Sequence, residues 1–277
     1  MKQMLTGRRI TMGAAVLALA AVTGCASVQT TDSGTIGVDR RQYMATSVPP
    51  EALQQEANKQ YAQMMAEAKA AGALDANSAQ VQRVRTITNR LISQVKAFRP
   101  DAASWPWEVH VVSSEDVNAW CMPGGKMAIY TGLIDRIKPT DDELAAVLGH
   151  EMAHALREHS REQISQQMAT QMGLSVLSAV TGVAGAADLG AALTNVMFTL
   201  PNSRTHESEA DLIGVELAAR AGYDPRAAVT LWQKMAALGG SSAPPEFLST
   251  HPSASTRSAE LQRNAEKVMP LYEAAKR

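Results

Sequence analysis

Aromatic residues are scarce in this chain. Phenylalanine, tryptophan and tyrosine together make up 4% of the 277 residues, whereas methionine occurs 14 times. This composition argues against a sandwich of stacked sheets, which uses large aromatic and β-branched side chains. Small and flexible apolar side chains instead favour packed helices. The composition therefore predicts a mainly α-helical protein.

An excess of positive charge is also lacking. Lys and Arg number 26 against 27 Asp and Glu, which leaves a formal net charge of −1. A chain without a basic field does not attract nucleic acid electrostatically, so we expect no nucleic-acid partner. The length and the 45% hydrophobic content suit one globular domain with an appendage.

Cysteine occurs only at Cys25 and Cys121, and the first lies at the end of an export signal. Residues 1–9 carry basic side chains and no acidic one, and residues 12–22 are an apolar run too short to span a bilayer. The following Val22-Thr23-Gly24-Cys25 resembles the lipobox of bacterial lipoproteins, in which the cysteine becomes the acylated N-terminus.

This resemblance implies a periplasmic lipoprotein of a Gram-negative bacterium, and Ala26 after the cysteine implies that a lipid anchor holds it in the outer membrane. A lipidated Cys25 leaves no cysteine pair for an intramolecular disulfide, so Cys121 is predicted to be a buried thiol. The alternative is an ordinary signal peptide with Cys25 near its cleavage site by chance.

Composition divides the chain into three parts. Residues 1–25 are interpreted as signal peptide and lipidation cysteine, residues 26–50 as a flexible tether, and residues 51–277 as a single domain. Within the domain, the spacing of apolar residues predicts helices at 51–71, 78–98, 204–221, 225–238 and 256–276, and strands at 107–112 and 126–130. The predicted fold class is mainly α with a small β-sheet.

A capping box begins the helix that carries the chemistry. Thr140, with Glu143 three residues later, precedes an apolar run, and the predicted helix continues to about Met172. Residues 173–200 are apolar, rich in Gly and Ala, and interrupted by Asp188. The uninterrupted parts are shorter than the roughly 18 residues that a membrane span needs. We interpret this segment as a buried segment or a cover over the active site, with a segment that dips into the membrane as the alternative.

The predicted helix contains His150-Glu151-Met152-Ala153-His154. Residues four apart share one helical face, so both imidazoles can point at one ion, a geometry that zinc accepts. Glu151 lies about 100° round the helix and can reach a water at the metal, which is the position of a general base. A catalytic zinc takes three protein ligands, so the motif needs a third.

A candidate third ligand lies in a second predicted helix. Glu207 and Asp211 are again four residues apart, so Glu207 can bind the metal while Asp211 accepts a hydrogen bond from the outer nitrogen of a ligating histidine. Taken alone, the two carboxylates would indicate a solvated acidic face with an ion pair to Arg204. Beside the histidine pair, the metal site is the better interpretation.

Three motifs in this order resemble one family. H-E-x-x-H is followed by S-R-x-x-E-x-x-A-D and preceded by N-A-W-C-M-P-G-G-K-M-A-I-Y-T-G-L-I. Over residues 107–261 this pattern is similar to the gluzincin metallopeptidase family that contains HtpX, the CAAX prenyl endopeptidases and the β-barrel assembly-enhancing proteases. The resemblance implies a zincin-like domain with zinc bound by His150, His154 and Glu207, Glu151 as base and acid, and Asp211 behind a ligand.

A fourth element, from Thr250-His251-Pro252-Ser253 to Arg257, resembles the H-P-x-x-x-x-R segment of the soluble periplasmic members. The resemblance implies that His251 lies near the metal, either as an electrophile for the oxyanion or as a gate at the water position of a latent enzyme. The alternative is a loop histidine that caps the next helix. The remaining histidines are expected to face away from the metal: His110, His159 and His206.

The predicted reaction is hydrolysis of peptide bonds, with one zinc ion per chain as the only cofactor. We expect an extended substrate to pair with an edge strand, and the candidate is Met127-Ala128-Ile129-Tyr130. Main-chain pairing tolerates any sequence, so unfolded or misassembled envelope proteins are the expected substrates. Association with the outer-membrane protein assembly machinery is a further expectation.

Two other functions compete with this interpretation. A lipoprotein chaperone or assembly factor for outer-membrane proteins would keep a latent metal site and hold its clients through residues 173–200. Glu151 argues against it, because a structural site needs no base. A zinc hydrolase of non-peptide substrates, such as peptidoglycan amide bonds, is a weaker rival, since the sequence has no apparent cell-wall-binding module.

Overall fold

The structure, a computed structural model, describes residues 24–179, 189–238, 246–252 and 256–277. Its α-helices are α2 (Pro50–Ala70), α3 (Ser78–Ile92), α4 (Thr131–Ile137), α5 (Asp141–Leu156), α6 (His159–Ala179), α7 (Leu189–Phe198), α8 (Arg204–Arg220), α9 (Ala227–Leu238), α10 (Glu246–Thr250) and α11 (Arg257–Ala275). Its strands are β1 (Cys25–Val28), β2 (Gln42–Ala45), β3 (Glu108–Val112), β4 (Ala119–Met122) and β5 (Lys126–Tyr130), and short 3-10 turns occur at Val95–Ala97 and Pro100–Ser104. The predicted fold class is confirmed.

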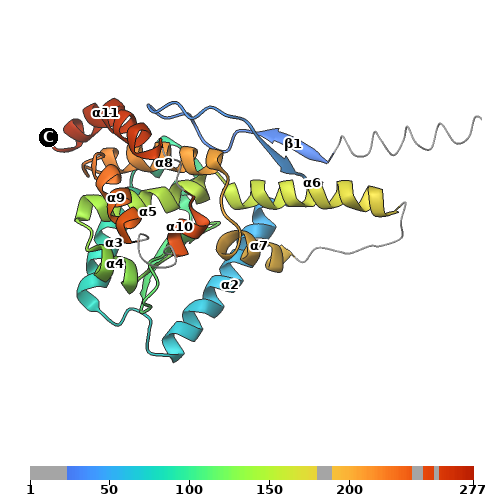
Figure 1. Cartoon of the computed structure of the whole chain (residues 1–277), viewed down its shortest axis with the longest axis horizontal. Helices are drawn as coiled ribbons and strands as arrows, with labels where there is room; N and C mark the ends of the chain where they lie inside the picture. Colours follow the sequence, from blue (N-terminus) through green and yellow to red (C-terminus); the bar gives the residue numbers. More distant parts are fainter. Residues whose placement is uncertain (1–23, 180–188, 239–245, 253–255) are drawn as a thin grey trace, which may run out of the picture.

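Helix α5 lies at the centre of the body, beside α8 (Figure 1). Every residue from Glu143 to Leu156 is buried, because α3, α8, α9 and β4 pack around this helix. The predicted capping box is present: the Thr140 side chain accepts a hydrogen bond from the backbone N–H of Glu143, whose carboxylate accepts one from the backbone N–H of Thr140.

Two glycines bring α5 and α8 into backbone contact. Gly149 of α5 faces Gly214 of α8, and a Cβ atom at Gly214 would lie only 2.7 Å from the backbone nitrogen of His150. A residue with a side chain does not fit at this separation. The glycine pair therefore sets the distance between the two helices that carry the predicted metal ligands.

The main sheet has the strand order β3-β5-β4, with β5 parallel to β3 and antiparallel to β4. Ala128 of β5 pairs with His110 on one side and with Trp120 on the other. The prediction that Met127 to Tyr130 form an edge strand is therefore wrong, because their main chain is paired on both sides. Strand β4 is an edge of this sheet, and it packs against α5.

The prediction of a flexible tether at residues 26–50 is also wrong. Strands β1 and β2 form an antiparallel hairpin, and β2 packs against α6 (Figure 1). Ile36, Val38 and Met44 are buried. These apolar side chains are few and widely spaced in a polar segment, but each one reaches the body of the protein. Their burial favours the ordered segment through the hydrophobic effect.

The helix predicted to continue to Met172 is interrupted at Glu158. This residue adopts a left-handed backbone conformation with φ of 54°, which separates α5 from α6. The Glu158 carboxylate forms ion pairs with Arg99 and Arg161, at 2.7 Å and 2.9 Å. Arg99 belongs to a distant segment and Arg161 lies three residues further along the chain, and both ion pairs stabilise a backbone conformation that glutamate alone disfavours.

The apolar segment at residues 173–200 is described in part. Helix α7 packs against α2 and α6, and residues 180–188 lie outside the described residues (Figure 1). Residues 1–23, most of the predicted signal peptide, lie outside them too. Within the described ranges, every helix is too short or too polar to cross a membrane.

Candidate active site

Helices α5 and α8 bring the predicted metal ligands together. His150 and His154 lie one turn apart on α5, and Glu207 lies in the first turn of α8. All three side chains are buried. The Ser203 side chain caps α8 by accepting a hydrogen bond from the backbone N–H of His206, which stabilises the turn that carries Glu207.

The ligand atoms converge on one point. Nε2 of His150 lies 3.1 Å from Nε2 of His154 and 3.5 Å from Oε2 of Glu207. Nε2 of His154 lies 3.4 Å from Oε1 of Glu207. His251 adds a fourth residue, and one ligand atom from each lies within 4.8 Å of the others. Tetrahedral zinc with bonds of about 2.0–2.1 Å separates its ligand atoms by about 3.3 Å, so the spacing fits zinc.

The protonation pattern also fits a metal ion. The outer nitrogens of His150 and His154 face Asp211 and His159, so the two Nε2 atoms are turned toward each other. Once Nε2 of His150 has lost its proton, two lone pairs face each other at this distance and repel, and a cation between them removes the repulsion. Oε1 of Glu207 has no hydrogen-bond partner among the described residues, which is expected of a metal ligand rather than of a buried carboxylate.

Charge within the site is tuned by burial and by close partners. Burial favours a raised pKa for Glu207, but the surrounding histidines hold that pKa well below its usual range. Burial favours a lowered pKa for His150, but hydrogen bonds to Asp211 and Glu207 raise it to about 9. Burial lowers the pKa of His154 to about 4 and that of His251 to about 3. Near neutral pH, His154 and His251 are therefore neutral and Glu207 is ionised, and His150 must release a proton when the site binds a cation.

Glu151 lies next to the ligand cluster and does not belong to it. Its Oε1 accepts no hydrogen bond from a described residue and lies 3.4 Å from Nε2 of His251. Burial raises the pKa of Glu151 to about 8. A carboxyl group that exchanges its proton near neutral pH is suited to general base and acid catalysis.

Arg257 is a site residue whose contacts were not predicted from the sequence. Its Nη1 donates to Oε2 of Glu207 at 3.0 Å, and its Nη2 donates to Oδ1 of Asp211 at 2.7 Å. The same Asp211 oxygen lies 3.0 Å from Nδ1 of His150, the arrangement expected of an orienting carboxylate. The H-P-x-x-x-x-R spacing marked Arg257, but only the fold shows that it joins the two carboxylates of α8.

His251 is directed toward the cluster by its contacts with α10. Its ring stacks on Phe247 with centroids 4.2 Å apart, and its Nδ1 lies 3.1 Å from the Phe247 carbonyl oxygen. The Thr250 hydroxyl lies 3.0 Å from the same Nδ1; when Nδ1 donates its hydrogen to the Phe247 carbonyl oxygen, which only accepts, Nε2 keeps a lone pair. That lone pair belongs to the atom that lies nearest to Glu151, beside the other ligand atoms.

The other histidines differ in how they relate to the cluster. Among the described residues, the group that could hold a metal includes neither His110 nor His206 nor His159. The expectation that His159 faces elsewhere is wrong, however, because its Nδ1 lies 2.9 Å from Nδ1 of His154. That expectation assumed a continuous helix, and the break at Glu158 removes the assumption.

Strand β4, rather than β5, borders the cavity in front of the cluster. The cavity is lined by Asn118, Ala119, Trp120 and Cys121, by Glu151, His154 and His251, and by Val196 and Met197 of α7. Cys121 is a buried free thiol, as predicted. The main chain available to an extended peptide at this cavity is therefore that of β4.

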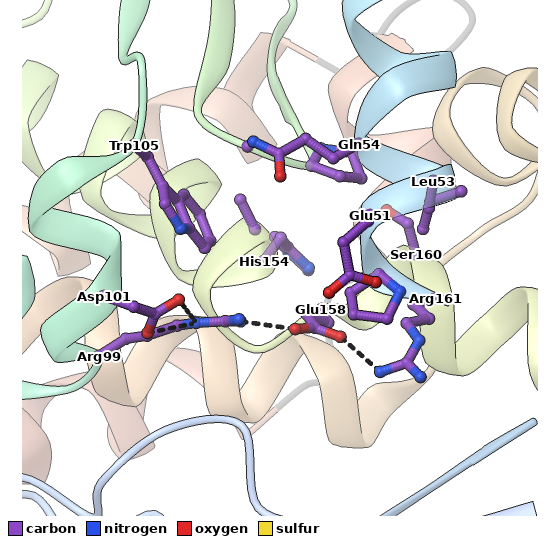
Figure 2. Close-up of a pocket in the computed structure, with 14 residues that line it drawn as sticks. Glu51, Leu53, Gln54, Arg99, Asp101, Trp105, His154, Glu158, Ser160 and Arg161 are labelled. Atoms are coloured by element: carbon purple, nitrogen blue, oxygen red, sulfur yellow. Dashed lines mark hydrogen bonds and ion pairs between the residues drawn. The ribbon is translucent and has the colours of Figure 1, made fainter. Parts of the chain in front are cut away.

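A second cavity meets the first at His154 (Figure 2). Figure 2 shows His154 between Trp105 on one side and Glu51 of α2 on the other, with Glu158 joined by ion pairs to two arginines below. Pro123 and Gly124, which follow β4, also line this cavity. Because β4 lines the first cavity, the turn after β4 lines the second, and His154 lines both, we infer that the two cavities are successive parts of one cleft.

Two histidines on one helix, a carboxylate from a second helix and a buried glutamate beside them define a metallohydrolase centre of the H-E-x-x-H class. Within that class, the chain belongs to peptidase family M48, whose family model matches residues 78–265. Members of this family are zinc-dependent metallopeptidases, so the predicted family and cofactor are confirmed.

Several curated proteins are similar to the chain. The mitochondrial metalloendopeptidase OMA1 of Arabidopsis thaliana is 43% identical over 152 residues, which cover 55% of this chain and 30% of the plant protein. The mitochondrial metalloendopeptidase OMA1 of Bos taurus is 35% identical over 202 residues, covering 69% and 38% of the two chains. The β-barrel assembly-enhancing protease of Escherichia coli is 27% identical over 203 residues, covering 69% and 40%. The match thus spans less than half the length of each of these relatives.

Proposed function

We propose that this protein is a zinc endopeptidase that cleaves unfolded or misassembled proteins of the cell envelope. The observation that carries the proposal is the buried Glu151, whose Oε1 accepts no hydrogen bond from a described residue, beside the ligand atoms of His150, His154 and Glu207. Bound zinc would supply a Lewis acid that polarises the scissile carbonyl group and acidifies a water molecule. Glu151 would then take a proton from the attacking water and return it to the leaving amine.

Substrate would lie along β4 in place of the strand expected from the sequence. An extended peptide that pairs with Ala119 to Met122 would pass in front of Glu151 and His154. Pairing through the main chain recognises an extended backbone rather than a particular sequence, which suits unfolded substrates. Val196 and Met197 of α7 line the same cavity, which supports the interpretation of the segment 173–200 as a cover over the cleft.

The position of His251 supports a latent resting state. With its ligand atom beside those of the other three residues, His251 would complete four-coordination and leave no open position for substrate. Activity would then require His251 to leave the cluster. The same observation favours the second candidate function, a chaperone or assembly factor for outer-membrane proteins with a closed metal site.

The sequence near Cys25 supports a periplasmic location with a lipid anchor in the outer membrane. Strand β1 begins at Cys25, so a lipid there would be attached directly to the folded hairpin. The printed name of the Escherichia coli relative, β-barrel assembly-enhancing protease, supports an envelope role and association with outer-membrane protein assembly. The OMA1 relatives are named as mitochondrial proteins, so the assigned compartment depends on the N-terminal sequence.

The experiment compares the purified full-length protein with Glu151→Gln and His251→Ala, and with His110→Ala as a control on β3. Cleavage of an unfolded model protein and zinc content are measured on all four. We expect one zinc per chain throughout, no cleavage by Glu151→Gln, and faster cleavage by His251→Ala than by wild type. If all four bind zinc and none cleaves, the chaperone function replaces the peptidase.

A further inference from the structure

A chain of buried hydrogen bonds leads away from the metal cluster toward the N-terminal segment. It starts at the outer nitrogen of His154, where Nδ1 lies 2.9 Å from Nδ1 of His159. It continues from Nε2 of His159 to Oε2 of Glu209, at 3.0 Å. All three side chains are buried, so the hydrogen bonds form in a medium of low dielectric constant, where they are strong.

The direction of both hydrogen bonds follows from chemistry. A carboxylate only accepts, so Nε2 of His159 carries a hydrogen and donates it to Glu209. Neutral His159 then has a lone pair on Nδ1, which accepts the hydrogen on Nδ1 of His154. His154 is left with its lone pair on Nε2, the atom that faces His150 and Glu207.

Glu209 is held in place by two arginines. Arg40 donates to its oxygens at 2.6 Å and 3.0 Å, and Arg157 donates to them at 3.1 Å from both Nε and Nη2. On the other side, the ring of His206 stacks on His159 with centroids 4.3 Å apart. The Glu209 carboxylate, at the end of this series of hydrogen bonds, is therefore fixed by four hydrogen bonds from the two arginines. The stacked His206 ring fixes the plane of the His159 ring.

We propose that His159 is a positioning residue for His154: backed by Glu209, it fixes the tautomer and the ring orientation in which His154 binds zinc through Nε2. The proposal rests on the proposed function, in which His154 is a zinc ligand. His150 is oriented directly by a carboxylate, Asp211, whereas His154 is oriented by a carboxylate through a second imidazole. The two ligating histidines are thus held by different groups.

The break between α5 and α6 explains how His159 reaches His154. On a continuous helix, a residue five positions later points about 140° away. The left-handed backbone of Glu158 ends α5 and lets the chain place the first residue of α6 against the ligand. The interruption therefore has a consequence for the metal site as well as for the fold.

The test measures the zinc dissociation constant of the full-length protein by competition with a chelator. In His159→Leu, the buried N–H of His154 loses its acceptor, and we expect zinc affinity to fall about 10- to 100-fold. In His159→Gln, the amide offers both an acceptor and a donor, so affinity stays within about threefold of wild type. The matched control is His110→Gln, on β3 and outside the metal cluster, with an effect below about threefold.

Equal zinc affinity in the leucine and glutamine variants overturns the proposal, because packing rather than hydrogen bonding would then explain the role of His159. A measurement on wild type keeps the test decisive if His159→Leu does not fold. Long-range proton–nitrogen NMR spectra of the zinc-loaded protein identify the histidine tautomers. We expect the hydrogen of His159 on Nε2 and that of His154 on Nδ1; a hydrogen on Nδ1 of His159 overturns the proposal.

Failure of the proposed function has a different signature. If wild type binds no zinc, or if His154→Ala binds zinc as tightly as wild type, His154 is not a ligand and the proposed function itself is wrong. If His154→Ala abolishes zinc binding while His159→Leu leaves the dissociation constant unchanged, only the role of His159 is wrong.

Discussion

The contact between α5 and α8 predicts that Gly214→Ala will damage the metal site without touching a ligand. A Cβ atom at Gly214 would lie 2.7 Å from the backbone nitrogen and 2.9 Å from the Cα atom of His150. Ordinary contacts of a Cβ atom begin at 3.4 Å. Both obstacles are backbone atoms, so no side chain can turn away, and the two helices must separate by about 0.7 Å.

This separation moves Glu207 and Asp211 away from His150 and His154, because each pair lies on its own helix. Metal–ligand distances tolerate changes of only about 0.2 Å, so we expect zinc affinity to fall at least about tenfold. Overpacking costs about 1–3 kcal/mol, and replacing a helical glycine by alanine returns about 1 kcal/mol. The free energy of unfolding should therefore decrease by only about 0–2 kcal/mol.

The assay combines chelator competition for zinc affinity with urea unfolding of the metal-free protein. Gly149→Ala is the graded control, because its Cβ atom would meet the carbonyl oxygen of Gly214 at 3.0 Å, a milder overlap. We expect Gly149→Ala to lie between wild type and Gly214→Ala in zinc affinity. Wild-type affinity in Gly214→Ala, or a larger loss in Gly149→Ala, would refute the reasoning that backbone contact sets the site.

Ion pairs, protonation and metal removal give three further tests. Arg40→Met removes the guanidinium that pairs with two buried carboxylates, so the free energy of unfolding measured in urea should fall by about 2 kcal/mol. Arg83→Met, the control, removes an exposed ion pair and should lower it by less than about 1 kcal/mol. Equal losses in the two variants would contradict this prediction. His150, with a pKa of about 9, must lose a proton to bind zinc, so zinc affinity measured by chelator competition should rise about tenfold per pH unit up to that pKa. A zinc affinity that does not change with pH would exclude this proton release. Free zinc at 100 times its dissociation constant adds about 2.7 kcal/mol to the free energy of unfolding. Removing zinc with a chelator should therefore lower the midpoint temperature of thermal unfolding. An unchanged midpoint would rule out a zinc site in the folded protein.

The candidate metal ligands could be picked out from the sequence because their pattern is local. His150 and His154 share a face of one helix whose start is marked by a capping box, and Glu207 and Asp211 repeat the spacing on α8. Helical periodicity depends only on neighbours in sequence, so no long-range contact is needed to read it. The fold then adds only the relative placement of the two helices.

The strand that borders the cleft could not be predicted in the same way. Strand β5 was predicted as a strand, but its central position depends on β4, which pairs with it on the side opposite β3. All four residues of β4 are buried, so the polar and apolar alternation that normally marks an edge strand is missing. Strand order is a tertiary property, and a correct local prediction of β5 carried no information about its neighbours.

Helix α8 shows most clearly why the rest of the site needed the fold. Glu207, Glu209 and Asp211 place three buried carboxylates within five residues, an arrangement that is costly unless cations neutralise it. Arg257 pairs with the first and the third, and Arg40 pairs with the second. The two arginines come from opposite ends of the described chain, so the acidic cluster looked like a solvated face when read alone. The same three carboxylates have different surroundings: one lies among the candidate metal ligands, and the other two contact the outer nitrogens of the candidate ligand histidines, directly or through another imidazole. The metal centre therefore depends on the N-terminal segment and on α11 as much as on the motif that reveals it.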